Sequence, residues 1–207
     1  MISLKNFNIS CEKNKDPILD ILIVELAHST TVLEVGSGSG QHALYFAEGL
    51  PHLRWQSTEL PAMLADLYDN LQTSSLTNIS PPMSLDVRRR PWLAEPVSAI
   101  FSANTLHIMS WDHVEHFFAG AGETLRPGGR LVVYGPFRYD NDFTSQSNAK
   151  FDCWLKERDS QSGIRDFEAV DRLARNQGMK VLVDHKMPSN NQLIVWERRN
   201  DQRPLLN

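Results

Sequence analysis

Thr31–Ala47, TVLEVGSGSGQHALYFA, is the stretch that decides the fold. It begins with a short apolar run, Val32–Val35, which is typical of a buried parallel strand. Residues Gly36–Gly40 then allow a tight turn that larger side chains would obstruct. Apolar residues follow at helical spacing until Pro51 ends the helix; they are Ala43, Leu44, Ala47 and Leu50. The stretch predicts a strand, a glycine turn and a helix, and the N–H groups of such a turn can hold a ligand.

The glycine pattern narrows the choice of ligand. A dinucleotide-binding turn has a third glycine where this chain has Gln41, and the Gly-Lys-Ser/Thr ending of a phosphate-binding loop is missing. The turn instead has an acidic residue, Glu34, two positions before the first glycine. This pattern resembles the cofactor motif of class I S-adenosylmethionine-dependent methyltransferases. The resemblance implies that Glu34 helps to hold the ammonium group of the cofactor. The resemblance also implies that the turn passes beneath the methionine part of the cofactor. The turn residues concerned are Gly36, Ser37, Gly38 and Gly40.

Two further acids follow the turn at the ends of predicted strands. Glu59 ends a strand over Leu53–Glu59, about 20 residues past the glycines, where such folds bind ribose hydroxyls. Asp86 lies in a strand over Met83–Val87 and resembles the adenine-binding acid of the same superfamily. We therefore add Glu59, Leu60, Asp86 and Val87 to the cofactor site. Arg88–Arg90 comes next; it is expected as a solvated loop, with an anionic-substrate contact as the alternative.

A fourth strand, Val97–Ser102, is apolar enough to be central in the sheet. Asn104 and His107 follow it, at the edge where open α/β sheets bind ligands. We expect Asn104 to contact the cofactor, mainly through its backbone. His107 is the candidate catalytic base because imidazole titrates near neutral pH; the alternative is that it only shapes the pocket. His42 either lines the pocket or lies on a helix surface.

A second match to the superfamily comes later in the chain. Ser110 begins a predicted helix with an apolar face, and Leu125–Leu131, LRPGGRL, ends that helix and starts a strand over Leu131–Tyr134. This helix–Leu-Arg-Pro-Gly-Gly–strand junction resembles the junction found in class I methyltransferases. Two matches in the expected order are more specific than either one alone.

Residues 135–165 form an aromatic insert. We interpret it as the acceptor site, because aromatic walls with few polar groups suit a small planar ligand. The alternative is that the rings simply cover the sheet. A helix is predicted over Ala149–Arg158. The candidate acceptor-binding residues are Tyr134, Tyr139, Asn148, Trp154 and Arg165; Asp166 is a further candidate to orient the acceptor.

The two ends of the chain complete the expected domain, which spans residues 1–207. Asp16 and Pro17 predict the start of a helix that ends near Ala27 within an N-terminal segment, residues 1–30; a lid over the cofactor is the alternative role. A helix over residues 166–178 precedes a terminal antiparallel hairpin made of Met179–Met187 and Gln192–Glu197. Residues 199–207 form a polar tail.

The alternation of strands and helices predicts a doubly wound α/β sheet with helices on both faces. The resemblance adds a Rossmann-like order of seven strands, 3-2-1-4-5-7-6, with strand 7 antiparallel. Longer phrases resemble a small family of domain-of-unknown-function proteins that includes methyltransferase-like protein 26. These phrases lie at residues 32–47, 101–111, 134–137, 147–149, 162–167 and 187–191.

Composition limits the partners. The net charge of −4 provides no basic field for nucleic acid or an anionic membrane, so neither partner is expected. Cys11 and Cys153 are too few for a disulfide framework and indicate a reducing compartment; with no signal-peptide pattern, we expect a cytoplasmic protein. His113 and His116 share a helix face, but no third ligand accompanies them, so no metal is expected.

The predicted function is methyl transfer from S-adenosylmethionine to a small-molecule acceptor, with S-adenosylhomocysteine as the product. The alternatives are a protein or RNA methyltransferase, or a non-catalytic module that binds the cofactor or a partner. A nicotinamide oxidoreductase is disfavoured because Gln41 interrupts its fingerprint. The acceptor and the oligomeric state are not specified by the sequence.

Overall fold

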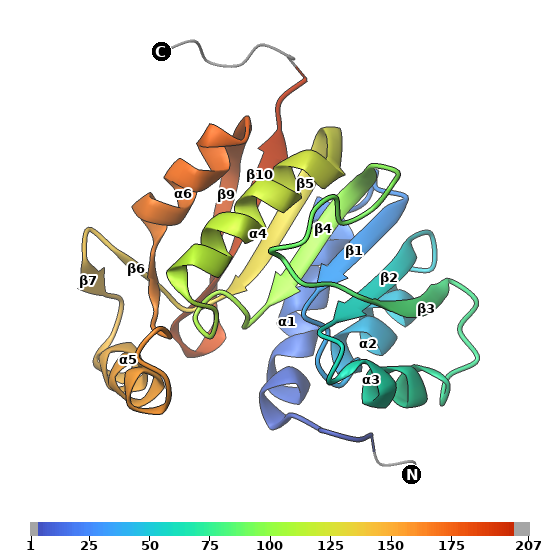
Figure 1. Ribbon diagram of the computed structural model, residues 1–207, viewed down its shortest axis with the longest axis horizontal. Helices are drawn as coiled ribbons and strands as arrows, with labels where there is room; N and C mark the ends of the chain where they lie inside the picture. Colours follow the sequence, from blue (N-terminus) through green and yellow to red (C-terminus); the bar gives the residue numbers. More distant parts are fainter. Residues whose placement is uncertain (1–3, 201–207) are drawn as a thin grey trace.

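A computed structural model describes residues 4–200, and a seven-stranded sheet forms its centre (Figure 1). The order along the sheet is β3-β2-β1-β4-β5-β10-β9, and β10 runs antiparallel to both of its neighbours. The strands are β1 (Thr31–Val35), β2 (Arg54–Glu59), β3 (Ile79–Ser84), β4 (Val97–Ala103), β5 (Leu125–Gly135), β9 (Met179–Met187) and β10 (Asn191–Arg198). The predicted sheet order and the terminal hairpin are confirmed.

Helices cover both faces of this sheet. They are α1 (Ile9–Glu25), α2 (Gln41–Gly49), α3 (Leu64–Leu71), α4 (Trp111–Thr124) and α6 (Phe167–Asn176). α1, α2 and α3 bury Ile18, Phe46 and Leu67 in one core, while α4 and α6 bury Phe117 and Val170 in a second core. Figure 1 shows α4 and α6 in front of the sheet and α1 behind it. No helix within residues 4–200 is long and apolar enough to cross a membrane.

The central strand β4 explains why the sheet needs two layers of helices. Successive side chains of a strand point to opposite faces. Ala99 and Phe101 accordingly belong to the core under α1–α3, whereas Ile100 belongs to the core under α4 and α6. All three side chains are fully buried. The continuous apolar run therefore predicts a strand that is covered on both sides.

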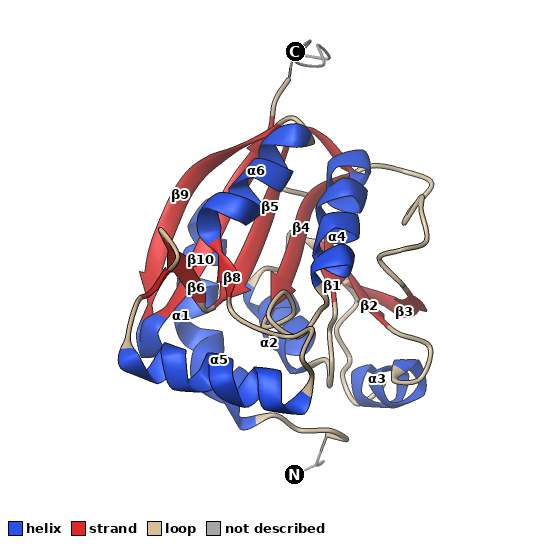
Figure 2. Ribbon diagram, turned by 60° about the vertical axis from the view of Figure 1, so that its left-hand side comes forward, coloured by secondary structure: helices blue, strands red, loops and turns tan. Residues whose placement is uncertain are grey.

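The aromatic insert folds into a small sheet and a helix beside the main sheet (Figure 2). The small sheet has the order β7-β6-β8, from β6 (Phe137–Tyr139), β7 (Asp142–Phe143) and β8 (Arg165–Asp166). Helix α5 (Gln146–Arg158) begins three residues before the predicted start, because the Ser145 side chain caps it by accepting a hydrogen bond from the Asn148 backbone N–H at 3.1 Å. Strands of two or three residues are too short to leave a period in the sequence.

The predicted start of the first helix is wrong. α1 begins at Ile9 and is capped by Asn8, whose side chain accepts from the Ser10 N–H at 2.8 Å. Pro17, expected at the first helical position, lies inside α1. Tertiary contacts offset the backbone hydrogen bond that a proline removes: the Asn8 N–H donates to Gln41 at 2.6 Å, and Asn14 is buried against α2.

The third strand is also shifted. It runs over Ile79–Ser84 rather than Met83–Val87, so Asp86 lies in the loop that follows it. Pro81 and Pro82 are tolerated because β3 is the edge strand and its pairing with β2 is irregular at this point. Residues 201–207 of the expected tail lie outside the described residues.

Candidate functional site

A cavity of about 510 Å³ opens at the carboxyl ends of β1, β2 and β4; we call it the cofactor cavity. Eight of the ten residues predicted to hold a cofactor line it: Gly36, Ser37, Gly38, Glu59, Leu60, Asp86, Val87 and Asn104. The other two, Glu34 and Gly40, are not on its surface. Ligands of open α/β sheets bind at this edge, because the strand order reverses there and leaves a crevice between crossovers.

The glycine turn is fixed against the end of β2. The Ser37 N–H donates to the Thr58 carbonyl at 2.9 Å, and the Gly38 N–H donates to Glu59 Oε2 at 2.8 Å. Gly36 has a φ of 77°, and a Cβ on it would lie 2.6 Å from Thr105 Cγ2. A Cβ on Gly38 would meet no protein atom within 4 Å. The turn is therefore packed tightly at Gly36 and open toward the cavity at Gly38, as a cradle for a ligand requires.

Glu34 lies buried beneath the turn. Its Oε2 accepts hydrogen bonds from the Ser37 hydroxyl at 2.8 Å, the Trp55 indole at 3.0 Å and the Ser57 hydroxyl at 3.4 Å. Oε1 takes part in none of these bonds. Burial raises the pKa of Glu34 to about 7, against the opposing effect of the three donors. Gly40 has a different role, because a Cβ there would lie 2.9 Å from Leu67, where α2 meets α3.

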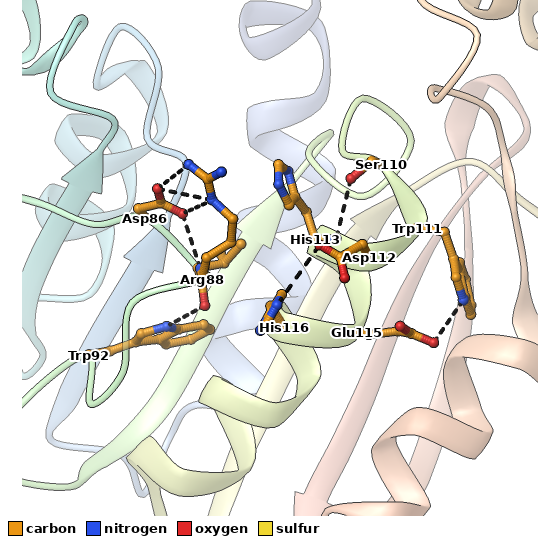
Figure 3. A network of polar contacts seen from close by, with 10 residues as sticks. Asp86, Arg88, Trp92, Ser110, Trp111, Asp112, His113, Glu115 and His116 are labelled. Carbon is orange, nitrogen blue, oxygen red and sulfur yellow. Dashed lines mark hydrogen bonds and ion pairs between the residues drawn. The ribbon is translucent and has the colours of Figure 1, made fainter.

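Asp86 is held by Arg88 at the far side of the cofactor cavity (Figure 3). The Arg88 backbone N–H donates to Asp86 Oδ1 at 3.0 Å, and its guanidinium donates to Oδ2 at 2.6 Å. This fork holds the pKa of Asp86 well below its usual range. His113 of α4 lines the same cavity. Arg88 bonds to both oxygens of Asp86, so a ligand that donates a hydrogen bond to this carboxylate must share it with Arg88 or displace Arg88.

A second cavity of about 800 Å³ adjoins the first; we call it the acceptor cavity. The two cavities share Asn8, Asn104 and Ile108 in their linings. Asn104 has a φ of 58° and donates its N–H to the Tyr134 carbonyl at 2.8 Å, which ties the ends of β4 and β5 together. Four predicted residues line the acceptor cavity: His107, Tyr134, Asn148 and Trp154.

His107 lies in the loop after β4 and is buried, with its ring against α5. Its ring meets the Phe151 ring edge-on, with 5.5 Å between centroids. Burial, and then the charge of Arg165, lowers the pKa of His107 to about 4. The imidazole is therefore neutral at pH 7 and has an acceptor nitrogen to offer.

Three predicted acceptor-binding residues lie outside both cavities. Arg165 donates through Nε to the Leu106 carbonyl at 3.0 Å and through its terminal nitrogen to the Met109 carbonyl, so it braces the loop that carries His107. Tyr139 donates to Asp184 of β9. Asp166 caps α6 and pairs with Arg138 at 3.5 Å. Their polar groups hold the cavity wall in place.

Residues of α1 line both cavities, although the sequence favours a lid over the cofactor only as the alternative role of this segment. His42 lines the cofactor cavity, Asn14 lines the acceptor cavity, and His42 Nε2 lies 2.7 Å from Asn14 Oδ1. Burial lowers the pKa of His42 to about 4. Asn6 and Asn8, just before α1, also line the cofactor cavity. Asn14 sits in a polar stretch of ordinary composition, so only the way in which α1 folds back brings it here.

Lys5 and Asn6, which precede α1, are hydrogen-bonded to residues of α3. The Lys5 backbone N–H donates to Asn70 at 2.8 Å, and Asn70 donates back to the Lys5 carbonyl at 2.9 Å. Asn6 donates to Asp66 at 2.9 Å. Within residues 4–200, no three His, Cys, Asp or Glu side chains gather where they could hold a metal ion.

Comparisons with known proteins bear on the family and the fold. The model of a family described as "Protein of unknown function (DUF938)" matches residues 5–198. An O-methyltransferase family protein from Burkholderia thailandensis is similar over 91% of this chain, with a TM-score of 0.79 and 16% identity, and the match covers 57% of that protein. An O-methyltransferase family 2 protein from Planctomyces limnophilus, in complex with apigenin, gives a TM-score of 0.77 at 17% identity, over 91% of this chain and 60% of its own.

The S-adenosylmethionine-dependent methyltransferase SibL is similar at a TM-score of 0.77 and 18% identity, over 92% of this chain and 56% of SibL. The chain thus spans less than two thirds of the length of each of these neighbours. At this level of identity the likeness establishes the fold, and the predicted class I methyltransferase fold is confirmed.

Proposed function

The chain belongs to the DUF938 family, whose function is unknown, and we propose that it transfers methyl groups from S-adenosylmethionine to small-molecule acceptors. The observation that carries this proposal is the shared wall of the two cavities. The cofactor cavity holds the glycine turn and two strand-end acids, and it meets the acceptor cavity at Asn104 and Ile108. A donor and an acceptor bound side by side are what group transfer requires.

The residues of the cofactor cavity fit the proposed cofactor. Glu59 and Asp86 provide acceptors for ribose hydroxyls and for an amino group, and Val87 provides an apolar contact. The open space over Gly38 admits an extended ligand. Glu34 lies beneath the turn rather than on the cavity surface, and we propose that it holds the ammonium group from there through Oε1, which is free of the bonds that its other oxygen accepts. We assign no metal to the reaction.

Methyl transfer requires mainly that the enzyme align the donor with the acceptor and exclude water from the site. When bound, S-adenosylmethionine supplies a methyl group on a positively charged sulfur; the acceptor's lone pair forms the new bond and the sulfur keeps the electrons of the old one. Phe151 and Trp154 contribute apolar surface that displaces water from the acceptor. We assign to neutral His107 the role of general base: it accepts a hydrogen bond from the acceptor's O–H or N–H and takes the proton that this group loses when it is methylated. Arg165 is a positioning residue, since it holds the loop of His107.

The acceptor cavity supports a small molecule rather than a macromolecule as the substrate. It is lined by residues of α1, α5 and the loop before β10, and its lining mixes rings with amides. Pockets of this composition suit compact, partly planar ligands. The apigenin complex of the Planctomyces limnophilus neighbour is consistent with such an acceptor.

Calorimetric titration with S-adenosylhomocysteine tests the cofactor site. We expect micromolar affinity, and a loss of about tenfold or more in Glu59→Ala and in Asp86→Ala, since each removes hydrogen bonds to a charged group. The matched control is Glu95→Gln, which changes an exposed acid outside both cavities. Melting temperatures must show that each variant is folded. An unmodified protein that binds no S-adenosylhomocysteine would refute the proposal.

Turnover separates the alternatives. Protein incubated with methyl-labelled S-adenosylmethionine and a cell extract should place the label in the low-molecular-weight fraction. Label in the protein or RNA fraction would indicate a macromolecular substrate. Tight cofactor binding with no labelled product in any fraction would favour a non-catalytic binding module.

A further inference from the structure

The acceptor cavity has an unusual charge for this protein. The chain as a whole is acidic, with a net charge of −4, yet no Asp or Glu lines this cavity and two cations do, Lys13 and Arg158. Among the residues that the structure describes, neither cation has a carboxylate partner in an ion pair. Unpaired cations in a hollow that is free of acids favour an anionic ligand.

The same cavity offers a flat aromatic surface. Trp154 stacks on Phe151 with 5.7 Å between ring centroids and 18° between the ring planes, and 46% of Trp154 is exposed. The Arg158 guanidinium lies 4.7 Å from the centre of the Trp154 ring. A half-exposed tryptophan on a cavity wall is a stacking platform, and the arginine lies against the same ring.

Amides supply the remaining polarity, and one of them is already fixed. The Asn148 amide donates to Thr144 Oγ1 and to the Asn190 carbonyl, both at 2.9 Å, so only its oxygen is left to face a ligand. That oxygen can accept a hydrogen bond from a hydroxyl or an amine but adds no charge. The net charge of the residues that line the cavity therefore comes from Lys13 and Arg158.

We propose that the acceptor is a planar aromatic acid, whose ring lies on the surface formed by Phe151 and Trp154 and whose anionic group is bound by Lys13 and Arg158. A guanidinium suits this task because its planar fork can donate two parallel hydrogen bonds to a carboxylate. The inference rests on the proposed function, since it names the substrate class of the acceptor cavity. It excludes cationic amines as preferred acceptors.

Four probes of similar size test ring and charge separately: benzoate, neutral benzamide, cationic benzylamine and non-planar cyclohexanecarboxylate. Their dissociation constants are measured by NMR on the protein alone and again in the presence of excess S-adenosylhomocysteine. Benzoate should bind about fivefold more tightly than benzamide or cyclohexanecarboxylate, and benzylamine should bind most weakly. Added salt should weaken benzoate and leave benzamide unchanged.

Variants assign these preferences to residues. Arg158→Gln and Lys13→Gln should each reduce the preference for benzoate over benzamide. Trp154→Leu should remove the preference for benzoate over cyclohexanecarboxylate. The control is Lys150→Gln, a cation of the same helix that lies outside the cavity lining; it should change nothing.

The two proposals fail in different ways. Equal binding of benzoate and benzamide, tighter binding of benzylamine, or no binding of any probe overturns the aromatic-acid inference, even if S-adenosylhomocysteine binds. A protein that selects benzoate but does not bind S-adenosylhomocysteine refutes the methyltransferase proposal and leaves the ligand class of the cavity standing.

Discussion

Raising the pH from 6 to 8 should strengthen the binding of S-adenosylhomocysteine about tenfold, because Glu34 must lose a proton before it can hold an ammonium group. The pKa of Glu34 is raised to about 7 by burial. About 9% of this carboxyl is then ionised at pH 6 and about 91% at pH 8. The ratio of these fractions sets the gain, which is ~1.4 kcal/mol.

His42 and Asp86, which line the cofactor cavity, do not make the affinity for S-adenosylhomocysteine rise between pH 6 and 8. The pKa of His42 is lowered to about 4, so its ring stays neutral between pH 6 and 8. The pKa of Asp86 is held well below its usual range by Arg88, so Asp86 stays ionised. His113 also lines the cavity. It is unchanged in every variant compared, so any contribution that it makes to the pH dependence is the same in all of them. The difference between the unmodified protein and Glu34→Gln therefore isolates Glu34.

The assay is isothermal titration calorimetry at pH 6, 7 and 8, in pairs of buffers with different enthalpies of ionisation. Binding at pH 7 should release about half a proton per ligand, since about half of the Glu34 carboxyls carry one before binding. Glu34→Gln keeps the size of the side chain, and it should bind more weakly with no pH slope from this site. Glu95→Gln should behave as the unmodified protein does.

A flat affinity across this pH range, or the same slope in Glu34→Gln, would refute the reasoning. Glu34 would then be a buried brace that holds Trp55, Ser37 and Ser57 beneath the turn, and the ammonium group would have another partner. Uptake of a proton on binding would have the same meaning, because it requires a group that ionises in the opposite sense.

Two further predictions concern the stability of the site. Gly36→Ala should destabilise the fold by ~2–3 kcal/mol in urea unfolding, since its Cβ would lie 2.6 Å from a side-chain carbon at a φ of 77°. Gly38→Ala has open space around its Cβ, so it should cost only ~1 kcal/mol of stability, yet it should abolish S-adenosylhomocysteine binding. Equal stabilities of the two variants would contradict this prediction. His42 and His107 both have a pKa near 4 in the folded protein and an ordinary value of 6.5, so each should contribute stability that is complete above pH 6.5 and falls by roughly 3 kcal/mol as the pH drops to 4. Unfolding in a Glu34→Gln background measures this loss without the opposing titration of Glu34, and a stability independent of pH would disprove both shifts.

The parts of the fold that the sequence predicts are those in which one local pattern and one tertiary role agree. The run over Val97–Ser102 places Ala99 and Phe101 on one face of the strand and Ile100 on the other, and the strand is covered on both sides. The helix capped by Ser110 presents Val114, Phe117, Phe118 and Ala121 at a spacing of three and four, and all four are fully buried. Most of the predicted cofactor residues line one cavity, because a glycine turn and strand ends meet at the same sheet edge.

The parts that the sequence does not predict depend on contacts between distant segments. Asp16 and Pro17 form a good local helix start, but Asn8 caps the helix two turns earlier, where α2 provides a partner for its N–H. Pro81 and Pro82 argue against a strand unless the strand is known to lie at the sheet edge. Asn14 and Lys13 enter the site only because α1 folds back over the carboxyl ends of β4 and β5.

The acceptor residues show why residue type alone does not identify a ligand contact. Arg165 and Arg158 are both cations of the aromatic insert, and the family resemblance favours Arg165 as the acceptor-binding residue, whereas no motif selects Arg158. Arg165 spends its donors on the backbone carbonyls of Leu106, Met109 and Gln161, so it has little left for a ligand. Arg158 makes only a stacking contact with Trp154 among the described residues, so its fork of donors remains available. The hydrogen-bonding capacity that a side chain has left after folding therefore distinguishes a brace from a binding group, and it is this difference that assigns the anion to Arg158.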